Sequence, residues 1–155
     1  MKGSPLLSEK SATLILFGAT GDLAHRMLFP SLYHLLCDGL LPEPFNILAS
    51  GRSEMDDVAF RETIRAALAT YLADEHHDEA RVNAFLEKIS YCAVSAGEQA
   101  HFDALAQKAK ALGDGPIAVY LSTPPSLFAP TAQGLAAAGL VSESTRIAME
   151  KPIGK

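Results

Sequence analysis

The sequence is poor in the features that mark secreted, membrane-spanning and nucleic-acid-binding proteins. Its 155 residues include two cysteines, Cys37 and Cys92, which are too few for a disulfide framework and lack metal-ligand spacing. No apolar run approaches the ~20 residues that a membrane helix needs, and the first residues lack the apolar core of a secretory signal. Positive charge is also scarce, because the formal net charge is −5, whereas a general nucleic-acid binder needs a basic surface. We therefore expect a cytoplasmic protein with neither a membrane nor a nucleic acid as partner.

The residues that are abundant indicate one folded domain. Hydrophobic residues make up 48% of the chain and charged residues 20%, which excludes a disordered or low-complexity protein. A length of 155 residues is sufficient for a single hydrophobic core. We expect a flexible N-terminal segment over residues 1–12 and one domain over residues 13–155.

Short apolar runs alternate with longer helical patterns along the chain. The runs predict strands at 13–17, 46–50, 89–94, 117–122 and 145–149, and helical patterns occupy about 22–37, 56–73, 82–89, 98–112 and 126–138. Strands that alternate with helices in this way indicate βαβ units, and continuous apolar strands imply a sheet that is covered on both faces. The predicted fold class is α/β, a Rossmann-type doubly wound parallel sheet with helices on both faces. Ligands of such sheets bind beyond the carboxyl ends of the strands.

The segment that follows the first strand is the first candidate binding site. It consists of Gly18, Ala19, Thr20, Gly21, Asp22 and Leu23, with the small Ala24 after them. Glycines allow the backbone to turn sharply and approach a pyrophosphate, and the free N–H groups at a helix start bind an anion. The spacing is GxxGxxA rather than GxGxxG, so an ordinary strand-to-helix turn is the alternative interpretation.

A second candidate, Arg52, follows the second strand. NAD-binding sites usually place an acidic residue here to hold the ribose 2′-hydroxyl, but residues 50–53 contain none. An arginine can instead bind a 2′-phosphate through two charge-assisted hydrogen bonds. The position predicts a preference for NADP, with a solvated surface arginine as the alternative.

Prolines mark the ends of the fourth and fifth strands. The turn Ser122-Thr123-Pro124-Pro125 would form a rigid wall beside a cofactor, although a purely structural turn fits equally well. Lys151, in the segment Glu150-Lys151-Pro152, would be a cation at the same edge of the sheet, or an ordinary surface lysine. The charged run at 74–79 is interpreted as a solvated connection, and no metal site is predicted.

Taken together, these segments resemble the coenzyme domain of the glucose-6-phosphate dehydrogenases from about Thr13 to Gly154. The family's opening signature corresponds to residues 18–33 (GATGDLAHRMLFPSLY), and the arginine, the double proline and Glu-Lys-Pro-x-Gly follow in the family's order. The resemblance implies that the full enzyme oxidises glucose 6-phosphate to its lactone with hydride transfer to NADP, the first step of the oxidative pentose phosphate route. It also implies that Gly18 to Leu23 bind the pyrophosphate, that Arg52 binds the 2′-phosphate, and that Ser95 lies near the dinucleotide.

The same resemblance implies that Lys151 contacts both the cofactor and the sugar phosphate. The chain departs from the family at Met27, where lysine is frequent, and at Phe128, where tyrosine is frequent. The family's histidine base lies in an Arg-Ile-Asp-His-Tyr-Leu-Gly-Lys segment, which these 155 residues lack. No catalytic residue is therefore predicted within 1–155, and we expect an inactive fragment without the catalytic and substrate domain of its parent, itself expected to be a homo-oligomer.

The sequence is also compatible with two other functions. A GATG turn also opens short-chain dehydrogenases, whose catalytic members need Tyr-x-x-x-Lys, and none of the four tyrosines has a lysine four places on. A non-catalytic NAD(P)-binding sensor or an epimerase-like Rossmann protein is the first alternative. The second is a scaffold with a degenerate Rossmann fold and no nucleotide.

Overall fold

The secondary structure follows the predicted alternation of strands and helices. The computed structural model describes residues 12–41, 45–73, 78–95, 97–113, 117–140 and 145–149. The strands are β1 (Ala12–Phe17), β2 (Phe45–Gly51), β3 (Ile89–Ala93), β4 (Ile117–Leu121) and β5 (Thr145–Met149). The helices are the π-helix η1 (Ala24–Leu28), α1 (Phe29–Cys37), α2 (Asp57–Tyr71), α3 (Glu79–Glu87), α4 (Gln99–Leu112), the 3-10 helix η3 (Pro125–Leu127) and α5 (Phe128–Ala137). Residues 1–11, the run 74–77, and the segment that contains Lys151 lie outside the described residues.

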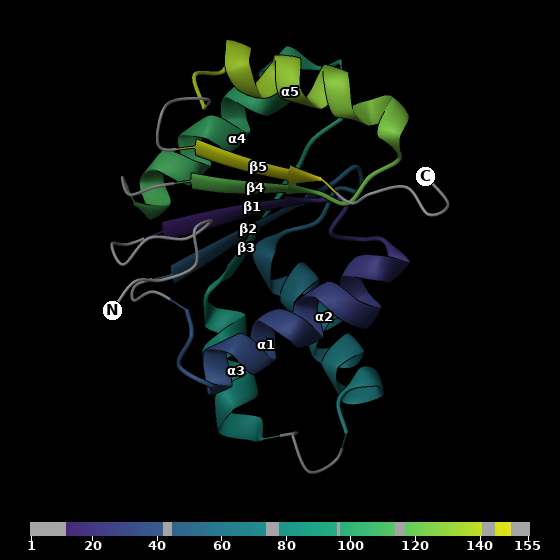
Figure 1. The fold of residues 1–155 in the computed structure, drawn as a ribbon, viewed down its shortest axis with the longest axis vertical. Helices are drawn as coiled ribbons and strands as arrows, with labels where there is room; N and C mark the ends of the chain where they lie inside the picture. Colours follow the sequence, from purple (N-terminus) through teal and green to yellow (C-terminus); the bar gives the residue numbers. More distant parts are fainter. Residues whose placement is uncertain are drawn as a thin grey trace.

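The strands form one parallel sheet in the order β3-β2-β1-β4-β5 (Figure 1). The predicted doubly wound sheet is therefore confirmed. The chain moves outward from β1 through β2 to β3, then returns to pair β4 with the other side of β1. This reversal creates a crevice between the carboxyl ends of β1 and β4, where sheets of this class bind ligands.

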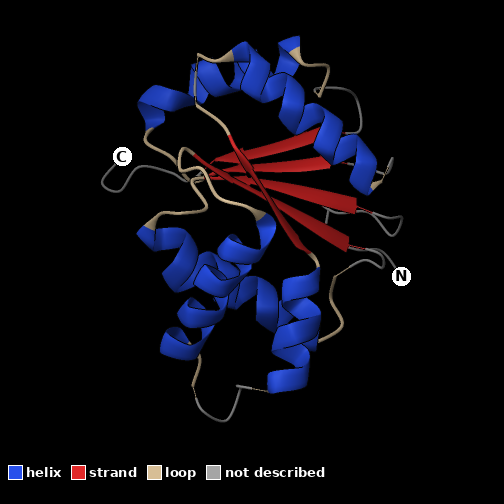
Figure 2. Cartoon of the chain, turned by 180° about the vertical axis from the view of Figure 1, so that it is seen from behind, coloured by secondary structure: helices blue, strands red, loops and turns tan. Residues whose placement is uncertain are grey.

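Helices cover both faces of the sheet (Figures 1 and 2). The alternation of side chains along β1 explains the two cores, because successive residues of a strand point to opposite faces. Leu14 and Leu16 belong to one cluster of buried residues, which includes Phe60 of α2. Ile15 and Phe17 belong to the other, which includes Leu105 of α4 and Leu135 of α5. Every residue of β1 is buried, as expected for a central strand.

Side chains and glycines mark several helix ends. The carboxylate of Asp56 accepts a hydrogen bond from the Ala59 N–H at 2.7 Å and caps the start of α2. At the end of α1, Gly39 has a φ of +72°, and the Leu40 N–H donates to the Leu35 carbonyl at 2.9 Å. Gly39 thereby ends α1, because a residue with left-handed backbone closes the last turn of a helix.

The helix predicted over about 22–37 contains a π-helical segment that the sequence pattern did not indicate. In η1 the Phe29 N–H donates to the Ala24 carbonyl, five residues back. Pro30, at the start of α1, has no N–H, and its ring would clash with the carbonyl of Arg26 in a regular α-helix. The wider π turn accommodates the proline, and π-helical turns of this kind are frequent at functional sites.

Three side chains occupy the outer backbone edge of β3, the strand at one end of the sheet. Asp57 accepts from the Tyr91 N–H at 2.8 Å, and the Lys108 ammonium donates to the Tyr91 carbonyl at 2.7 Å. The Arg61 guanidinium donates to the Ile89 carbonyl at 2.8 Å. Lys108 also forms an ion pair with Asp57 at 3.1 Å, so α2 and α4 are joined around this edge. Three outward backbone groups of this edge strand are thereby satisfied within the molecule.

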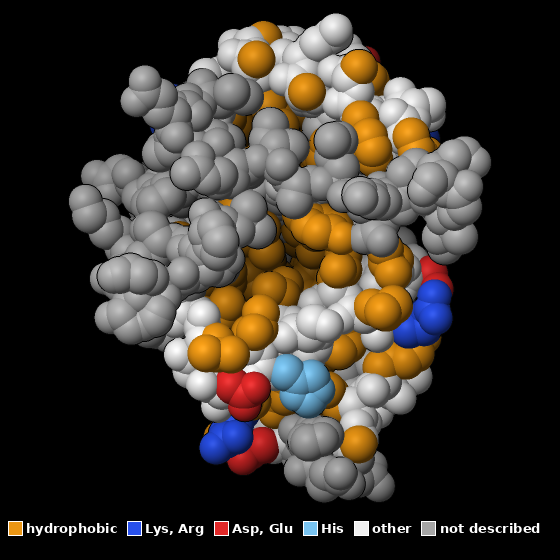
Figure 3. Space-filling view, in the orientation of Figure 1, with side chains coloured by type: hydrophobic (Ala, Val, Ile, Leu, Met, Phe, Trp, Pro, Cys, Tyr) orange, Lys and Arg blue, Asp and Glu red, His pale blue; other side chains and the backbone are white. Residues whose placement is uncertain are grey.

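Some hydrophobic side chains remain exposed to solvent on the face of the molecule that Figures 1 and 3 present. Figure 3 shows hydrophobic side chains gathered around a hollow in the middle of this face. On α1, Leu32 and Leu36 are only partly buried and Leu35 is 36% exposed. None of the helices in the described part of the chain has the length and apolar character needed to cross a membrane.

Candidate functional site

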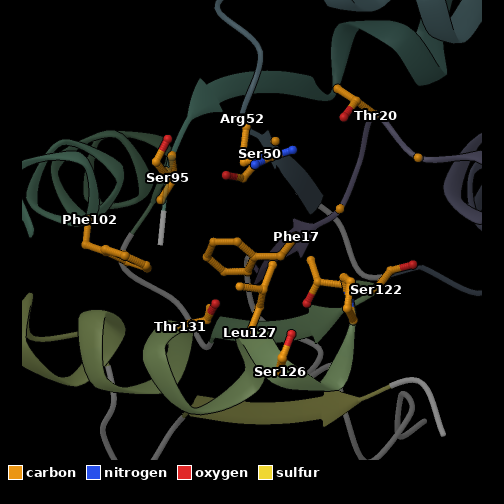
Figure 4. Close-up of a pocket in the computed structure, with 16 residues that line it drawn as sticks. Phe17, Thr20, Ser50, Arg52, Ser95, Phe102, Ser122, Ser126, Leu127 and Thr131 are labelled. Carbon is orange, nitrogen blue, oxygen red and sulfur yellow. The ribbon is translucent and has the colours of Figure 1, made fainter. Parts of the chain in front are cut away.

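A pocket of about 660 Å³ opens at the carboxyl ends of the central strands (Figure 4). Its volume lies within the range of small-molecule and cofactor sites. It is lined by Phe17, Gly18, Thr20, Gly21, Ser50, Gly51, Arg52, Val94, Ser95, Phe102, Ser122, Thr123, Pro124, Ser126, Leu127 and Thr131. The pocket therefore lies at the reversal of strand order, where the fold predicts a ligand.

The turn after β1 depends on glycine for two reasons. Gly18 has a φ of +80°, which residues with a side chain rarely adopt. A Cβ on Gly18 would also lie 2.7 Å from the carbonyl carbon of Ser122, and closer still to its oxygen. The Gly21 N–H donates to the Gly18 carbonyl at 3.0 Å and closes the turn. The backbone therefore passes directly against the segment after β4, which leaves room in front of it for a ligand.

The floor of the pocket is apolar and aromatic. The rings of Phe17 and Phe102 lie 6.2 Å apart, tilted by 36°, and Leu127 approaches from η3 (Figure 4). A Cβ on Gly134 of α5 would lie 2.5 Å from the Phe102 ring, so this glycine allows the ring to pack against α5. Such a floor suits the flat faces of a nucleotide base or sugar.

Two buried hydroxyls at the pocket have no protein partner among the described residues. They belong to Ser50, at the end of β2, and Thr123, after β4. Ser50 is fully buried, with an exposed fraction of 0%. A buried hydroxyl without a hydrogen bond costs free energy, so both are suited to bind polar atoms of a ligand in the pocket.

Arg52 supplies positive charge at the mouth of the pocket. Its side chain is exposed and lines the pocket on the same side as Ser50 (Figure 4). None of the carboxylates in the described ranges forms an ion pair with it. The guanidinium is therefore available for an anionic group of a ligand, and a guanidinium binds phosphate in a two-pronged geometry.

The structure brings together five of the predicted site residues. Gly18, Thr20, Gly21, Arg52 and Ser95 all line the pocket. The Ser95 N–H donates to Nδ1 of His101 at 3.0 Å, which fixes the loop after β3 against α4.

The other predicted residues lie differently. Ala19 is buried below the turn and its N–H donates to the Ser50 carbonyl at 2.9 Å. Asp22 is exposed and forms an ion pair with Arg26 at 3.1 Å, and Leu23 is partly buried. None of these three side chains lines the pocket. Lys151 lies outside the described residues.

Sequence reasoning missed the part of the pocket that comes from the last two helices. Phe102 of α4 and Thr131 of α5 line it, together with Leu127. Their helical spacing predicts only a buried face, because the approach of α4 to α5 depends on packing. Ser50 did have a signal, since a hydroxyl residue directly follows the apolar run 47–49 at the binding edge. Of the two departures from the family, Met27 is 52% exposed and Phe128 packs against the core, outside the pocket.

His25, in η1, is a half-buried titratable group next to the glycine turn. Burial lowers the pKa of its imidazole, although a hydrogen bond to the backbone of Ala19 and the charge of Asp22 oppose this. Its Nε2 is buried without a partner among the described residues, and its ring packs edge-on against Phe29 at 6.4 Å. The imidazole therefore links the turn, at the backbone of Ala19, to the Phe29 ring at the start of α1.

Comparisons with known proteins agree with this geometry. The family described as "Glucose-6-phosphate dehydrogenase, NAD binding domain" matches residues 15–155. The chain is 44% identical to glucose-6-phosphate 1-dehydrogenase of Zymomonas mobilis subsp. mobilis over 96% of this chain and 30% of the relative. It is similar to the crystal structure of glucose-6-phosphate 1-dehydrogenase from Mycobacterium avium, with a TM-score of 0.81 and 33% identity over 93% of this chain and 30% of that one. A glucose-6-phosphate dehydrogenase solved in complex with its substrate glucose-6-phosphate gives a TM-score of 0.77 and 29% identity, over 92% of this chain and 31% of that one. The chain thus spans about 30% of the length of these relatives.

Proposed function

Because the chain belongs to the glucose-6-phosphate dehydrogenase family, with its match in the NAD-binding domain, we propose that residues 13–155 form the coenzyme-binding domain of an NADP-dependent glucose-6-phosphate dehydrogenase. The observation that carries the proposal is the meeting of the Gly18 turn and Arg52 at one pocket. The comparisons do not favour the sensor and epimerase alternatives, because the relatives are named glucose-6-phosphate dehydrogenases.

The residues of the pocket fit a dinucleotide phosphate. The Gly18 turn would approach the pyrophosphate through its backbone. The hydroxyls of Ser50 and Thr123, which have no hydrogen-bond partner among the described residues, would bind polar atoms of the cofactor. Arg52 would hold the 2′-phosphate through charge-assisted hydrogen bonds, each worth about 1.5–3 kcal/mol. Residues 50–53 offer no carboxylate for a ribose 2′-hydroxyl, so the donor set favours NADP over NAD.

The bound cofactor would supply a hydride acceptor, while the chain's own residues bind and orient it. We propose that the complete enzyme oxidises glucose 6-phosphate to its lactone, is cytoplasmic, and assembles as a homo-oligomer. We also propose that Lys151 contacts both the cofactor and the substrate phosphate. Within that proposal, the role of residues 13–155 is to bind and position the cofactor.

Titration calorimetry of the 155-residue chain with NADP and with NAD tests the proposal. We expect tighter binding of NADP, by about one to two decades if Arg52 contributes one or two charge-assisted bonds. Arg52→Ala should remove this preference and leave the affinity for NAD unchanged. Arg81→Ala is the matched control, because Arg81 is an exposed arginine on α3 that pairs with Asp78 at 3.9 Å. Equal affinity for the two dinucleotides, or a preference that survives Arg52→Ala, would contradict the assignment.

A further inference from the structure

Tyr91 is a buried tyrosine whose hydroxyl reaches the loop that carries Arg52. It lies in the middle of β3 with an exposed fraction of 2%. Its ring stacks on Phe60 of α2 at a centroid distance of 4.7 Å and an angle of 26°. Its hydroxyl donates to the backbone carbonyl of Ser53 at 2.7 Å. The side chain therefore extends from the third strand to the residue that directly follows Arg52.

The same hydroxyl also lies close to Gly51, the residue that precedes Arg52. A Cβ on Gly51 would lie 3.0 Å from the Tyr91 hydroxyl oxygen, a separation at the lower limit for real Cβ atoms. The hydroxyl thus lies beside Gly51, where it leaves little room for a side chain, and bonds Ser53, so one oxygen borders the backbone on both sides of Arg52. Burial raises the pKa of this hydroxyl, Cys92 and Glu54 add to the shift, and the backbone of Gly51 opposes it. The group therefore stays protonated and remains a donor.

The backbone of Tyr91 is itself fixed from two helices. Its N–H donates to Asp57 of α2 at 2.8 Å, and its carbonyl accepts from Lys108 of α4 at 2.7 Å. Asp57 and Lys108 are joined to each other at 3.1 Å. Because the backbone of Tyr91 is fixed by these bonds, its hydroxyl has a defined position. The hydroxyl can therefore set the position of the loop whose Ser53 carbonyl it bonds.

We propose that Tyr91 is a positioning residue that holds the Arg52 loop in the geometry that binds the 2′-phosphate of a dinucleotide. The inference rests on the proposed function and deepens it, because it assigns part of the NADP preference to a residue outside the pocket. An arginine loses side-chain entropy when it binds a phosphate, and a preorganised loop reduces the further cost of ordering its backbone. NAD, which lacks the 2′-phosphate, gains no affinity from the preorganised Arg52 loop.

The test is titration calorimetry of four proteins with NADP and with NAD: the 155-residue chain, Tyr91→Phe, Arg52→Ala and the double variant. Tyr91→Phe retains the ring that stacks on Phe60 and removes only the hydroxyl. We expect it to weaken NADP binding about three- to tenfold, the worth of one hydrogen bond, and to change NAD binding less than about twofold. In the Arg52→Ala background it should change neither affinity, because a positioning residue acts only through the group that it positions.

A merely structural tyrosine would give a different result. It would weaken both dinucleotides alike, or add its effect to that of Arg52→Ala, and either outcome overturns the inference. Tyr71→Phe is the matched control, because Tyr71 is 44% exposed at the far end of α2. If Tyr91→Phe fails to fold, Lys108→Met releases the Tyr91 carbonyl instead and should reduce the NADP preference in the same selective way. An unchanged preference in that variant would overturn the inference as well.

The failure of the inference and of the proposed function are distinguishable. If the wild-type chain prefers NADP through Arg52 and Tyr91→Phe retains the full preference, only the role of Tyr91 is wrong. If Arg52→Ala leaves the wild-type preference intact, the assignment of the 2′-phosphate to Arg52 fails, and the inference fails with it.

Discussion

Gly18 and the backbone carbonyl of Ser122 lie in direct contact, so no side chain fits between the turn after β1 and the segment after β4. The Ser122 N–H donates to the Phe17 carbonyl at 3.0 Å, which continues the pairing of the two strands up to this contact. The carboxyl ends of the two central strands are thereby closed against each other, and the pocket lies in front of them.

Gly18→Ala is expected to reduce both stability and cofactor binding. The left-handed backbone alone costs a residue with a Cβ about 1–2 kcal/mol, and overlap with Ser122 adds to this cost. Gly39→Ala is the control, because Gly39 has a φ of +72° with nothing within 4 Å of an added Cβ. Chemical denaturation should show a larger loss of the free energy of unfolding for Gly18→Ala. Equal losses would show that the close approach contributes nothing.

Ser50→Ala is expected to change binding and stability in opposite directions. Its buried hydroxyl has no protein partner among the described residues, so removal should leave the cofactor-free protein as stable or up to about 1 kcal/mol more stable. NADP binding should weaken about two- to tenfold, because one ligand hydrogen bond is lost. Ser90→Ala, at a buried serine of β3 outside the pocket, is the control for thermal unfolding and calorimetry. Tighter NADP binding by Ser50→Ala would contradict the prediction.

Asp57 is expected to make the fold sensitive to acid. Burial would raise the pKa of its carboxyl, but hydrogen bonds from the Tyr91 N–H and the Lys108 ammonium, with the nearby charges, hold it below its ordinary value of 3.8. A carboxyl with a depressed pKa in the folded state contributes stability above the unfolded pKa and loses it as the pH falls through the folded value. Between about pH 5 and pH 2 the free energy of unfolding should therefore fall more steeply for the wild type than for Asp57→Asn. Parallel curves for the two proteins would disprove the contribution of this network.

His25 is expected to titrate below its ordinary pKa of 6.5, because burial penalises its charged form. The unfolded chain then takes up this proton first, so the free energy of unfolding should decrease as the pH falls from about 7.5 towards 5.5. His25→Gln should remove that part of the slope. Proton NMR of the imidazole gives the midpoint directly, and a midpoint at or above 6.5 would refute the prediction.

The fold was predictable because local patterns and global topology agree. β1 is apolar throughout since it is central and covered on both faces, and Asp56 and Gly39 mark helix ends by chemistry that acts within a few residues. The π-helical segment was not predictable, although Pro30 is visible in the sequence. A proline can also end or kink a helix, and packing decides between these outcomes.

The candidate site was predictable where it follows strand ends and hidden where it depends on packing. The Gly18 turn and Arg52 are adjacent to strands in sequence, so the topology of the sheet brings them together. Phe102 and Thr131 enter the pocket only because α4 and α5 cross that face of the sheet. The contact of Tyr91 with Ser53 joins residues 38 positions apart, and no local pattern indicates it.

The side chains along the outer edge of β3 also determine where the sheet can grow. Asp57, Lys108 and Arg61 already bind the N–H and carbonyl of Tyr91 and the carbonyl of Ile89, which an incoming strand would need. A further strand, whether from the same polypeptide or from another molecule, would have to displace an ion pair and its hydrogen bonds to dock there. Extension of the sheet by β-pairing is thus hindered at its β3 end.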